Sequence, residues 1–168
     1  MIEKFKTIFV VKTSLISLYL ALTFPIPFIS SENLRIFSIF TFVFGLLLII
    51  NITNDYVNTC DEKLSYKTSF ISKIFGKKSW EIFWKDIKLI KSLPTSQGSN
   101  VHYFISNKNE SFLFPQRVEN FERFLSIVEQ KTKLNVKKIS YISPLWTYKL
   151  LTCLSLFMII GEIIAFTI

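Results

Sequence analysis

The sequence predicts a membrane protein that joins transmembrane helices to one α+β domain, and three observations support this fold class. Half of the 168 residues are hydrophobic and only 19% are charged. Long, mostly uncharged apolar stretches lie near both ends of the chain. Between them, short β-favourable segments precede one helical pattern. We therefore expect an N-terminal tail and two-helix transmembrane hairpin in residues 1–52, a soluble domain in 53–143 and a third transmembrane helix in 144–168.

The hairpin is predicted from two uncharged segments, residues 13–29 and 36–52, each close to the roughly 20 residues that cross a bilayer core. The first segment has a basic start, as signal peptides do, but no small-x-small cleavage site follows it. We therefore interpret it as an uncleaved anchor. Pro25 and Pro27 remove backbone donors near its end and favour a bend into the short turn at residues 30–35.

The third apolar run, residues 145–168, contains Lys149 near its start and Glu162 near its end. An intramembrane carboxylate often marks a proton path or a contact with another helix. A helix that starts at residue 145 also reaches the far headgroups after about 20 residues, where Glu162 would simply meet water. The sequence leaves both interpretations of Glu162 open.

Lysines beside the spans indicate the orientation of the chain. Three precede the first span and five lie before or at the start of the third, whereas the hairpin turn carries only Arg35 beside Glu32. The positive-inside rule then places the N-terminus and the central domain on the cytoplasmic side and the C-terminus on the opposite side. Residues 53–149 hold sixteen basic and nine acidic side chains, and this positive surplus would also attract anionic lipid headgroups.

The central domain is expected to begin with an antiparallel meander. Its β-favourable runs are separated by turn-forming residues and cover residues 64–71, 79–84, 86–93, 101–106 and 111–114. In the run 101–106, Val101, Tyr103 and Ile105 alternate with more polar residues, so we expect these three to face inward.

An amphipathic helix is predicted to close the central domain, after Phe114 and Pro115. Apolar residues from Val118 to Val128 recur at spacings of three and four. Acidic residues near its start and lysines near its end suit the helix dipole. This order predicts an α+β domain in which the helix covers the open apolar side of a curled sheet.

The residues offer little evidence for catalysis. His102 is the only histidine and has no carboxylate or cysteine motif beside it, so we expect a structural or solvent-facing role. Cys60 and Cys153 belong to no metal-binding or redox motif. We expect a non-enzyme with no catalytic, cofactor-binding or metal-binding residues, no nucleic-acid partner and no identified small-molecule substrate.

Several residues are candidates for binding a lipid or a protein partner. Lys77 and Lys78 precede Trp80 and Trp84, whose spacing places both rings on one face of a strand, either in the core or in an aromatic surface patch. The polar loop at residues 92–100 is long enough to contact a partner. The full candidate set is Lys77, Lys78, Trp80, Trp84, Ser96, Gln97 and Arg117, with Glu162 as a candidate intramembrane contact.

Two resemblances extend these expectations. The central region, roughly residues 55–134, resembles the membrane-tethered PH-like domains of bacteria. The resemblance lies in Trp84-Lys85-Asp86-Ile87, Ile90, and Phe114-Pro115 with the helix that follows. This resemblance implies a PH-like antiparallel β domain capped by one C-terminal helix. A cyanobacterial family of uncharacterised membrane proteins is similar in its Pro94-Thr95-Ser96-Gln97-Gly98, Tyr103-Phe104, Phe114-Pro115 and Pro144-Leu145-Trp146-Thr147-Tyr148 segments.

The hairpin followed by a basic β-rich domain also resembles the photosystem I assembly factor family of cyanobacteria and chloroplasts. This chain differs from that family by its C-terminal span, its low glycine content and the lack of a shared residue motif. The resemblances imply a scaffold or assembly factor for a membrane complex, in a thylakoid or plasma membrane, with lipids and other membrane subunits as partners. The alternatives are an anionic-lipid-binding module and a small accessory subunit of a transporter or enzyme complex.

Overall fold

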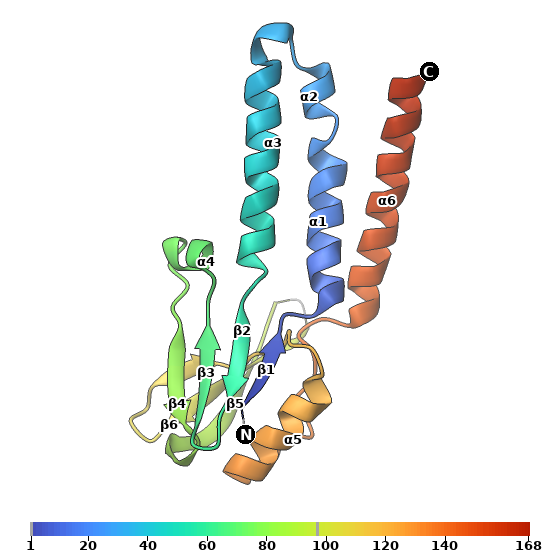
Figure 1. The fold of residues 1–168 in the computed structure, drawn as a ribbon. Helices are drawn as coiled ribbons and strands as arrows, with labels where there is room; N and C mark the ends of the chain where they lie inside the picture. The colour runs from blue at the N-terminus through green and yellow to red at the C-terminus, as the bar shows by residue number, and fades with distance from the viewer. Residues whose placement is uncertain (1, 97) are drawn as a thin grey trace. The chain divides into compact units, whose positions relative to one another are not determined.

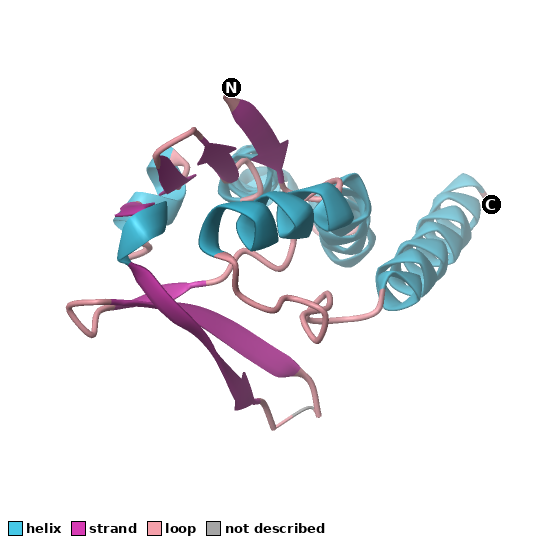
Figure 2. Ribbon diagram, turned by 90° about the horizontal axis from the view of Figure 1, so that it is seen from below, coloured by secondary structure: helices cyan, strands magenta, loops and turns pink. Residues whose placement is uncertain are grey.

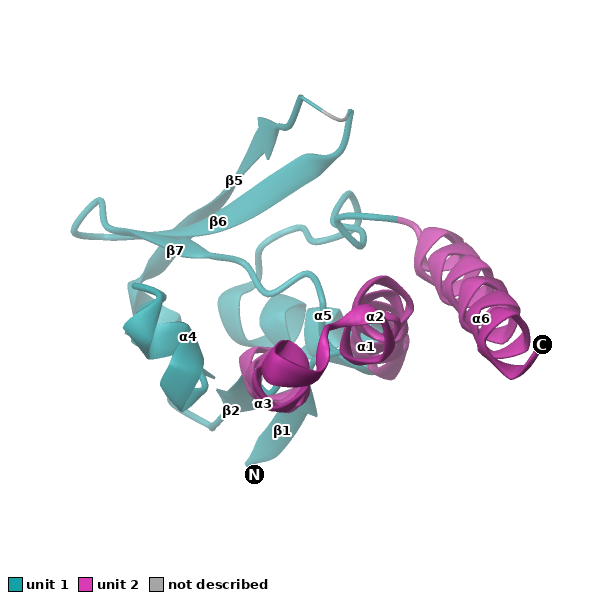
Figure 3. Ribbon diagram, turned by 90° about the horizontal axis from the view of Figure 1, so that it is seen from above, with its two compact units in different colours: residues 1–8, 54–143 teal, residues 9–53, 144–168 magenta. Residues whose placement is uncertain are grey.

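The structure is a computed structural model that describes residues 2–96 and 98–168. The chain forms two compact units, coloured separately in Figure 3. Residues 1–8 and 54–143 form one unit, which we call the β unit, and residues 9–53 and 144–168 form the helical unit. The boundary differs from the sequence interpretation because the first eight residues, expected to be a tail, belong to the β unit.

The helical unit contains the three apolar helical segments that the sequence predicts. Its helices are α1 (Phe9–Thr23), α2 (Ile26–Ile29), α3 (Glu32–Ile52) and α6 (Leu145–Thr167) (Figure 1). The segments Phe9–Ile29, Glu32–Ile52 and Leu145–Thr167 are long and apolar enough to cross a membrane. The first two begin four residues earlier than expected, so Lys12 lies inside α1 rather than before it. Between α1 and α2 the helix is interrupted at Phe24 and Pro25, as proline chemistry requires.

A tyrosine on α1 fits against a glycine on α3. The hydroxyl of Tyr19 donates a hydrogen bond to the carbonyl of Phe42 at 2.8 Å, and the two rings stack. A Cβ atom added to Gly45 would overlap the Tyr19 hydroxyl. Gly45 therefore provides the space that lets α1 and α3 pack at this point.

Replacing Gly45 with leucine is expected to lower the thermal unfolding midpoint of the detergent-solubilised protein, because Tyr19 must leave its position. A leucine at Gly161 is the matched control, since an added Cβ there meets no atom within 4 Å. Equal midpoints for the two variants would contradict the proposed packing role of Gly45.

The β unit is built from two antiparallel sheets. The first contains, in spatial order, β1 (Glu3–Lys6), β2 (Tyr56–Thr59), β3 (Lys63–Lys67) and β4 (Trp80–Phe83). The second contains β5 (Ile87–Pro94), β6 (Asn100–Ser106) and β7 (Ser111–Leu113). The mixed α+β class is confirmed, and the later four predicted strands correspond to β4, β5, β6 and β7.

Three features of the first sheet differ from the sequence interpretation. Strands β1 and β2 were not predicted, because each has only four residues and is stabilised by pairing between segments some fifty residues apart. The expected strand at 64–71 ends at Lys67, where the chain turns into the short helix α4 (Phe70–Ile74). Ser69 caps α4 by accepting a hydrogen bond from the amide of Ser72.

The helix α5 (Phe121–Thr132) lies between the two sheets, as Figure 2 shows. Its buried side contributes Phe121, Phe124, Ile127 and Val128 to the core. Ion pairs hold its exposed side: Arg123 contacts Glu3 of β1 at 2.7 Å, and Lys131 contacts Asp61 at 3.2 Å. The expected amphipathic helix is therefore present.

The core between the sheets is rich in phenylalanine. Phe104, Phe114 and Phe124 are fully buried. The ring centroid of Phe114 lies 4.7 Å from that of Phe104 and 5.6 Å from that of Phe124. Phe104 lies on the face of β6 that we expected to be outward, so that expectation was wrong. Burying the large Phe104 ring is more favourable than keeping the polar residues on the same face of β6 in water. His102, on that face, is therefore buried as well and is 3% exposed.

Candidate functional site

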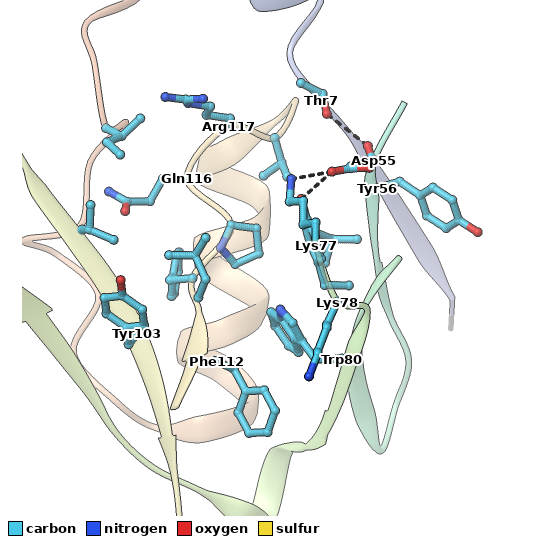
Figure 4. Close-up of a pocket in the computed structure, with 18 of the residues that line it drawn as sticks. Thr7, Asp55, Tyr56, Lys77, Lys78, Trp80, Tyr103, Phe112, Gln116 and Arg117 are labelled. Carbon is cyan, nitrogen blue, oxygen red and sulfur yellow. Dashed lines mark hydrogen bonds and ion pairs between the residues drawn. The ribbon is translucent and has the colours of Figure 1, made fainter. Parts of the chain in front are cut away.

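A cleft of about 540 Å³ opens in the β unit between the two sheets (Figure 4). Its walls come from β2, β3 and the start of β4 on one side, and from β6, β7 and residues 114–118 on the other. Apolar and aromatic side chains dominate the lining, and a few charged groups lie among them. This combination is typical of ligand and peptide sites in proteins.

Trp80 forms the inner wall of the cleft. Its ring stacks on Tyr66 of the neighbouring strand, with centroids 5.8 Å apart. It also contacts two rings of the second sheet, Phe112 at 5.4 Å and Phe104 at 6.2 Å. Trp80 therefore bridges the two sheets, and the half-buried indole remains part of the cleft surface.

Asp55 forms the polar end of the cleft and is only 5% exposed. Its carboxylate accepts hydrogen bonds from the Ser69 amide at 2.7 Å and the Tyr66 hydroxyl at 2.9 Å. The Lys77 ammonium lies 2.5 Å from Oδ2, and the contact is drawn in Figure 4. The Asp55 carbonyl accepts a further bond from Thr7 at 3.1 Å. The Asp55 carboxylate therefore links β3, the Ser69 amide before α4 and Lys77 after α4, while the Asp55 carbonyl holds Thr7, the residue that follows β1.

Burial alone would raise the pKa of the Asp55 carboxyl, but Lys77, the Ser69 amide and Tyr66 outweigh it and lower that pKa. Burial would likewise lower the pKa of Lys77, but Asp55 and Tyr66 raise it above its ordinary value. Both groups therefore remain charged at neutral pH. The pair is structural, because Lys77 is already neutralised by Asp55.

Replacing Asp55 with asparagine is expected to destabilise the protein by about 1–3 kcal/mol at pH 7, because a buried charge-assisted network is lost. The pKa of Asp55 is lower in the folded protein than in the unfolded chain, where it is about 3.9. The ionised carboxylate therefore stabilises the fold fully above that pH, and this stabilisation is lost as the pH falls through the lower pKa of the folded state. Urea denaturation at several pH values should show the wild-type advantage shrinking below about pH 4. An advantage that stays constant across that range would contradict this assignment.

Two basic side chains that line the cleft have no ion-pair partner among the described residues. Neither Lys78 nor Arg117 makes an ion pair with another described residue, and both are exposed. Figure 4 shows Lys78 next to Trp80. In contrast, Gln116 is buried and its side-chain amide is fully hydrogen-bonded. It accepts a hydrogen bond from the His102 amide and donates hydrogen bonds to the carbonyls of Asn100 and Ser140. Positive charge at the cleft is therefore available to an external anionic group.

The last strand of each sheet contributes to the lining of the cleft. Within the described residues, β4 is the last strand of the first sheet and β7 is the last strand of the second. Trp80 of β4 and all three residues of β7 line the cleft. Unpaired backbone groups along such edges can hydrogen-bond to an added extended segment.

The structure brings four of the predicted site residues together and separates the rest. Lys77, Lys78, Trp80 and Arg117 all line the cleft. The two tryptophans do not share a strand face, since β4 ends at Phe83 and a 3₁₀ turn (Trp84–Asp86) follows. Trp84 is 5% exposed and donates from Nε1 to the Cys60 carbonyl at 2.8 Å, so it belongs to the core.

The remaining predicted residues lie elsewhere. Ser96 is exposed in the connection between β5 and β6 and does not line the cleft, and Gln97 lies outside the described residues. Glu162 is half-buried on α6, and its Oε2 has no hydrogen-bond partner among the described residues. Cys60 and Cys153 are free thiols.

Sequence reasoning missed Asp55, Tyr66 and Phe112 as parts of the site. Asp55 lies three residues after an apolar helix and resembles a linker residue, while Tyr66 and Phe112 have the ordinary appearance of strand residues. The sequence contained one local signal, which is that Asp55 directly precedes the β-favourable residues 56–59 and that two adjacent lysines, Lys77 and Lys78, follow later in the chain. It does not indicate which lysine forms the ion pair.

Comparison with known proteins gives one informative similarity. An uncharacterised protein of Synechocystis sp. is 27% identical over 147 residues, which cover 84% of this chain and 74% of that protein. No family model matches the chain. The similarity supports the resemblance to an uncharacterised cyanobacterial family, and the three apolar helices are consistent with a membrane protein.

Proposed function

We propose that this chain is a membrane-anchored, non-catalytic scaffold or assembly factor for a membrane protein complex, in which the β unit is a PH-like domain that binds an extended segment of a partner. The observation that carries this proposal is the aromatic cleft, which Trp80 of β4 and all three residues of the last strand β7 help to line, with Lys78 and Arg117 at its surface and free of ion pairs to described residues. The aromatic wall suits apolar side chains of the bound segment, and the basic groups suit an acidic one.

The order of the segments supports anchorage of the β unit at one membrane face. If all three apolar helices cross the bilayer, the start of α1, the end of α3 and the start of α6 lie on the same side. The β unit is covalently joined to these three points. The lysines before and within the first turns of α1 and α6 favour the cytoplasmic side for it. The cyanobacterial relative favours a thylakoid or plasma membrane, and a photosynthetic complex is the partner we propose.

Affinity purification from native cyanobacterial membranes in mild detergent tests the proposal. Lys78→Glu with Arg117→Glu reverses charge at the cleft, and we expect this double variant to lose at least tenfold of the co-purifying membrane subunits. The control is Lys88→Glu with Lys108→Glu, an equal charge change at exposed residues away from the cleft. Equal recovery from both double variants would exclude the cleft as the binding site, and recovery of no membrane subunit by the wild-type protein would reject the scaffold function.

Anionic-lipid binding is a second candidate function, because Lys78 lies beside the apolar wall formed by Trp80. Such a pair would suit a headgroup and the first part of its acyl chains. Lipid binding of the full-length protein in nanodiscs should then rise with phosphatidylglycerol content and fall with salt. Indifference to both variables would exclude this function and leave the scaffold proposal intact.

A role as an accessory subunit of a transporter or enzyme complex has one supporting observation, the Glu162 Oε2 atom without a described hydrogen-bond partner. Glu162→Gln should then impair growth or the level of the associated complex. Unchanged growth and complex levels would exclude an essential proton-relay role.

A further inference from the structure

The connection between β3 and β4 exposes an unusual group of apolar side chains. Phe70, Ile74 and Phe75 are 74%, 68% and 71% exposed. They lie on α4 and on the residue that follows it, at the tip of the β3–β4 connection in Figure 1. Single exposed apolar residues are common on proteins, but three large ones within six positions are typical of a contact surface.

The chain holds these side chains outward in a fixed conformation. Thr68 and Ser79 close the base of the connection through a 2.9 Å hydroxyl contact, and the Ser79 hydroxyl accepts from the Thr68 amide at 3.1 Å. The Lys77 amide donates to the Ser72 carbonyl at 2.9 Å. Ser72 is 3% exposed, so this polar residue of α4 is buried while Phe70, Ile74 and Phe75 face out.

The charges in this segment indicate the chemistry of its partner. Lys73 and Lys78 lie on either side of the exposed Phe75 in sequence, and neither makes an ion pair within the described part of the chain. Lys77 is paired with Asp55. The surface is therefore apolar with uncompensated positive charge, the composition of segments that lie in an anionic membrane interface.

Chain length brings a lipid surface within reach. Asp55, which binds both the Ser69 amide and Lys77, is three residues beyond Ile52, the last residue of an apolar helix. Three extended residues span at most about 11 Å. If α3 crosses a bilayer, Asp55 and the segment attached to it must lie close to the headgroups.

We propose that Phe70, Ile74 and Phe75 insert into the anionic headgroup region of the membrane, with Lys73 binding lipid phosphates. This contact adds a fourth attachment of the β unit to the bilayer and would set how the cleft is presented. The inference rests on the membrane anchorage in the proposed function and is independent of what the cleft binds.

The test uses the full-length protein in nanodiscs, with Cys60 and Cys153 replaced by serine and one spin-labelled cysteine at Phe75. We expect the label to be more accessible to oxygen than to a water-soluble nickel complex, as lipid-embedded sites are. The preference should strengthen when phosphatidylglycerol is added to phosphatidylcholine, and should weaken in a Phe70→Ser, Ile74→Ser background. A label at Lys108, exposed in the β6–β7 turn, is the aqueous control.

A label at Phe40, which is 67% exposed on α3, separates the two ways in which this test can fail. If the Phe40 label is in lipid but the Phe75 label stays in water in both lipid compositions, the inserted segment is refuted and the anchorage stands. A Phe40 label in water would refute the anchorage itself. Protection of the Phe75 label only after native membrane proteins are added would assign this surface to a protein partner and overturn the lipid proposal.

Discussion

Replacing Phe114 with alanine is expected to destabilise the protein by about 3–5 kcal/mol, because it removes a fully buried ring from the centre of the core. The ring contacts Phe104 of the second sheet and both Phe121 and Phe124 of α5. Alanine would leave a cavity among these rings. The cleft should be disrupted as well, because Phe114 is one of its lining residues.

Urea denaturation in detergent, followed by tryptophan fluorescence, measures this effect on the full-length protein. Leu113→Ala is the matched control, because Leu113 is the preceding residue and is 47% exposed. We expect the control to change the free energy of unfolding by no more than about 0.5 kcal/mol. Similar losses in both variants would show that the core is not centred on Phe114.

Replacing Phe5 with alanine is expected to lower the free energy of unfolding by about 3 kcal/mol, although Phe5 is only the fifth residue of the sequence. Phe5 is 4% exposed, pairs with Val57 across the sheet and packs edge-on against Phe124 at 5.4 Å. Its loss would loosen β1 from both the sheet and α5. This prediction distinguishes an integral strand from the tail that the sequence suggested.

The neighbouring residue Lys4 provides the control for Phe5 on the same strand. Its side chain is exposed and its ammonium lies 3.8 Å from the centre of the Tyr56 ring. An exposed cation–π contact contributes about 0.5–1 kcal/mol, so Lys4→Ala should have a much smaller effect than Phe5→Ala in the same denaturation measurement. A Phe5 variant as stable as the Lys4 variant would mean that β1 is dispensable.

Much of the fold follows from local patterns in the sequence. Uncharged runs of about 20 residues predict the apolar helices, and strong periodicity predicts α5. The strands β5 and β6 are eight and seven residues long and are bounded by turn residues, so propensity is sufficient to identify them. These elements are stabilised largely by contacts that their own segments encode.

The elements that were missed depend on distant partners. β1 exists because Phe5 and its neighbours pair with residues 56–59, and no local pattern in four residues reports that pairing. The inward face of β6 was misassigned because the Phe104 ring packs against Trp80 and Phe114, which come from other segments of the chain. The site had the same limitation: Lys77 and Lys78 are adjacent in sequence, but only the folded position of Asp55 separates a structural lysine from an available one.

The most direct test of the membrane-anchored arrangement is a sidedness measurement on sealed native membrane vesicles. Single cysteines at Ser31, Lys108 and Ile168, in a background with Cys60 and Cys153 replaced by serine, would be labelled with a membrane-impermeant maleimide. All three positions are exposed. Three crossings predict that Ser31 and Ile168 react from one side of the membrane and Lys108 from the other. Reaction of all three positions from the same side would contradict the arrangement and the function built on it.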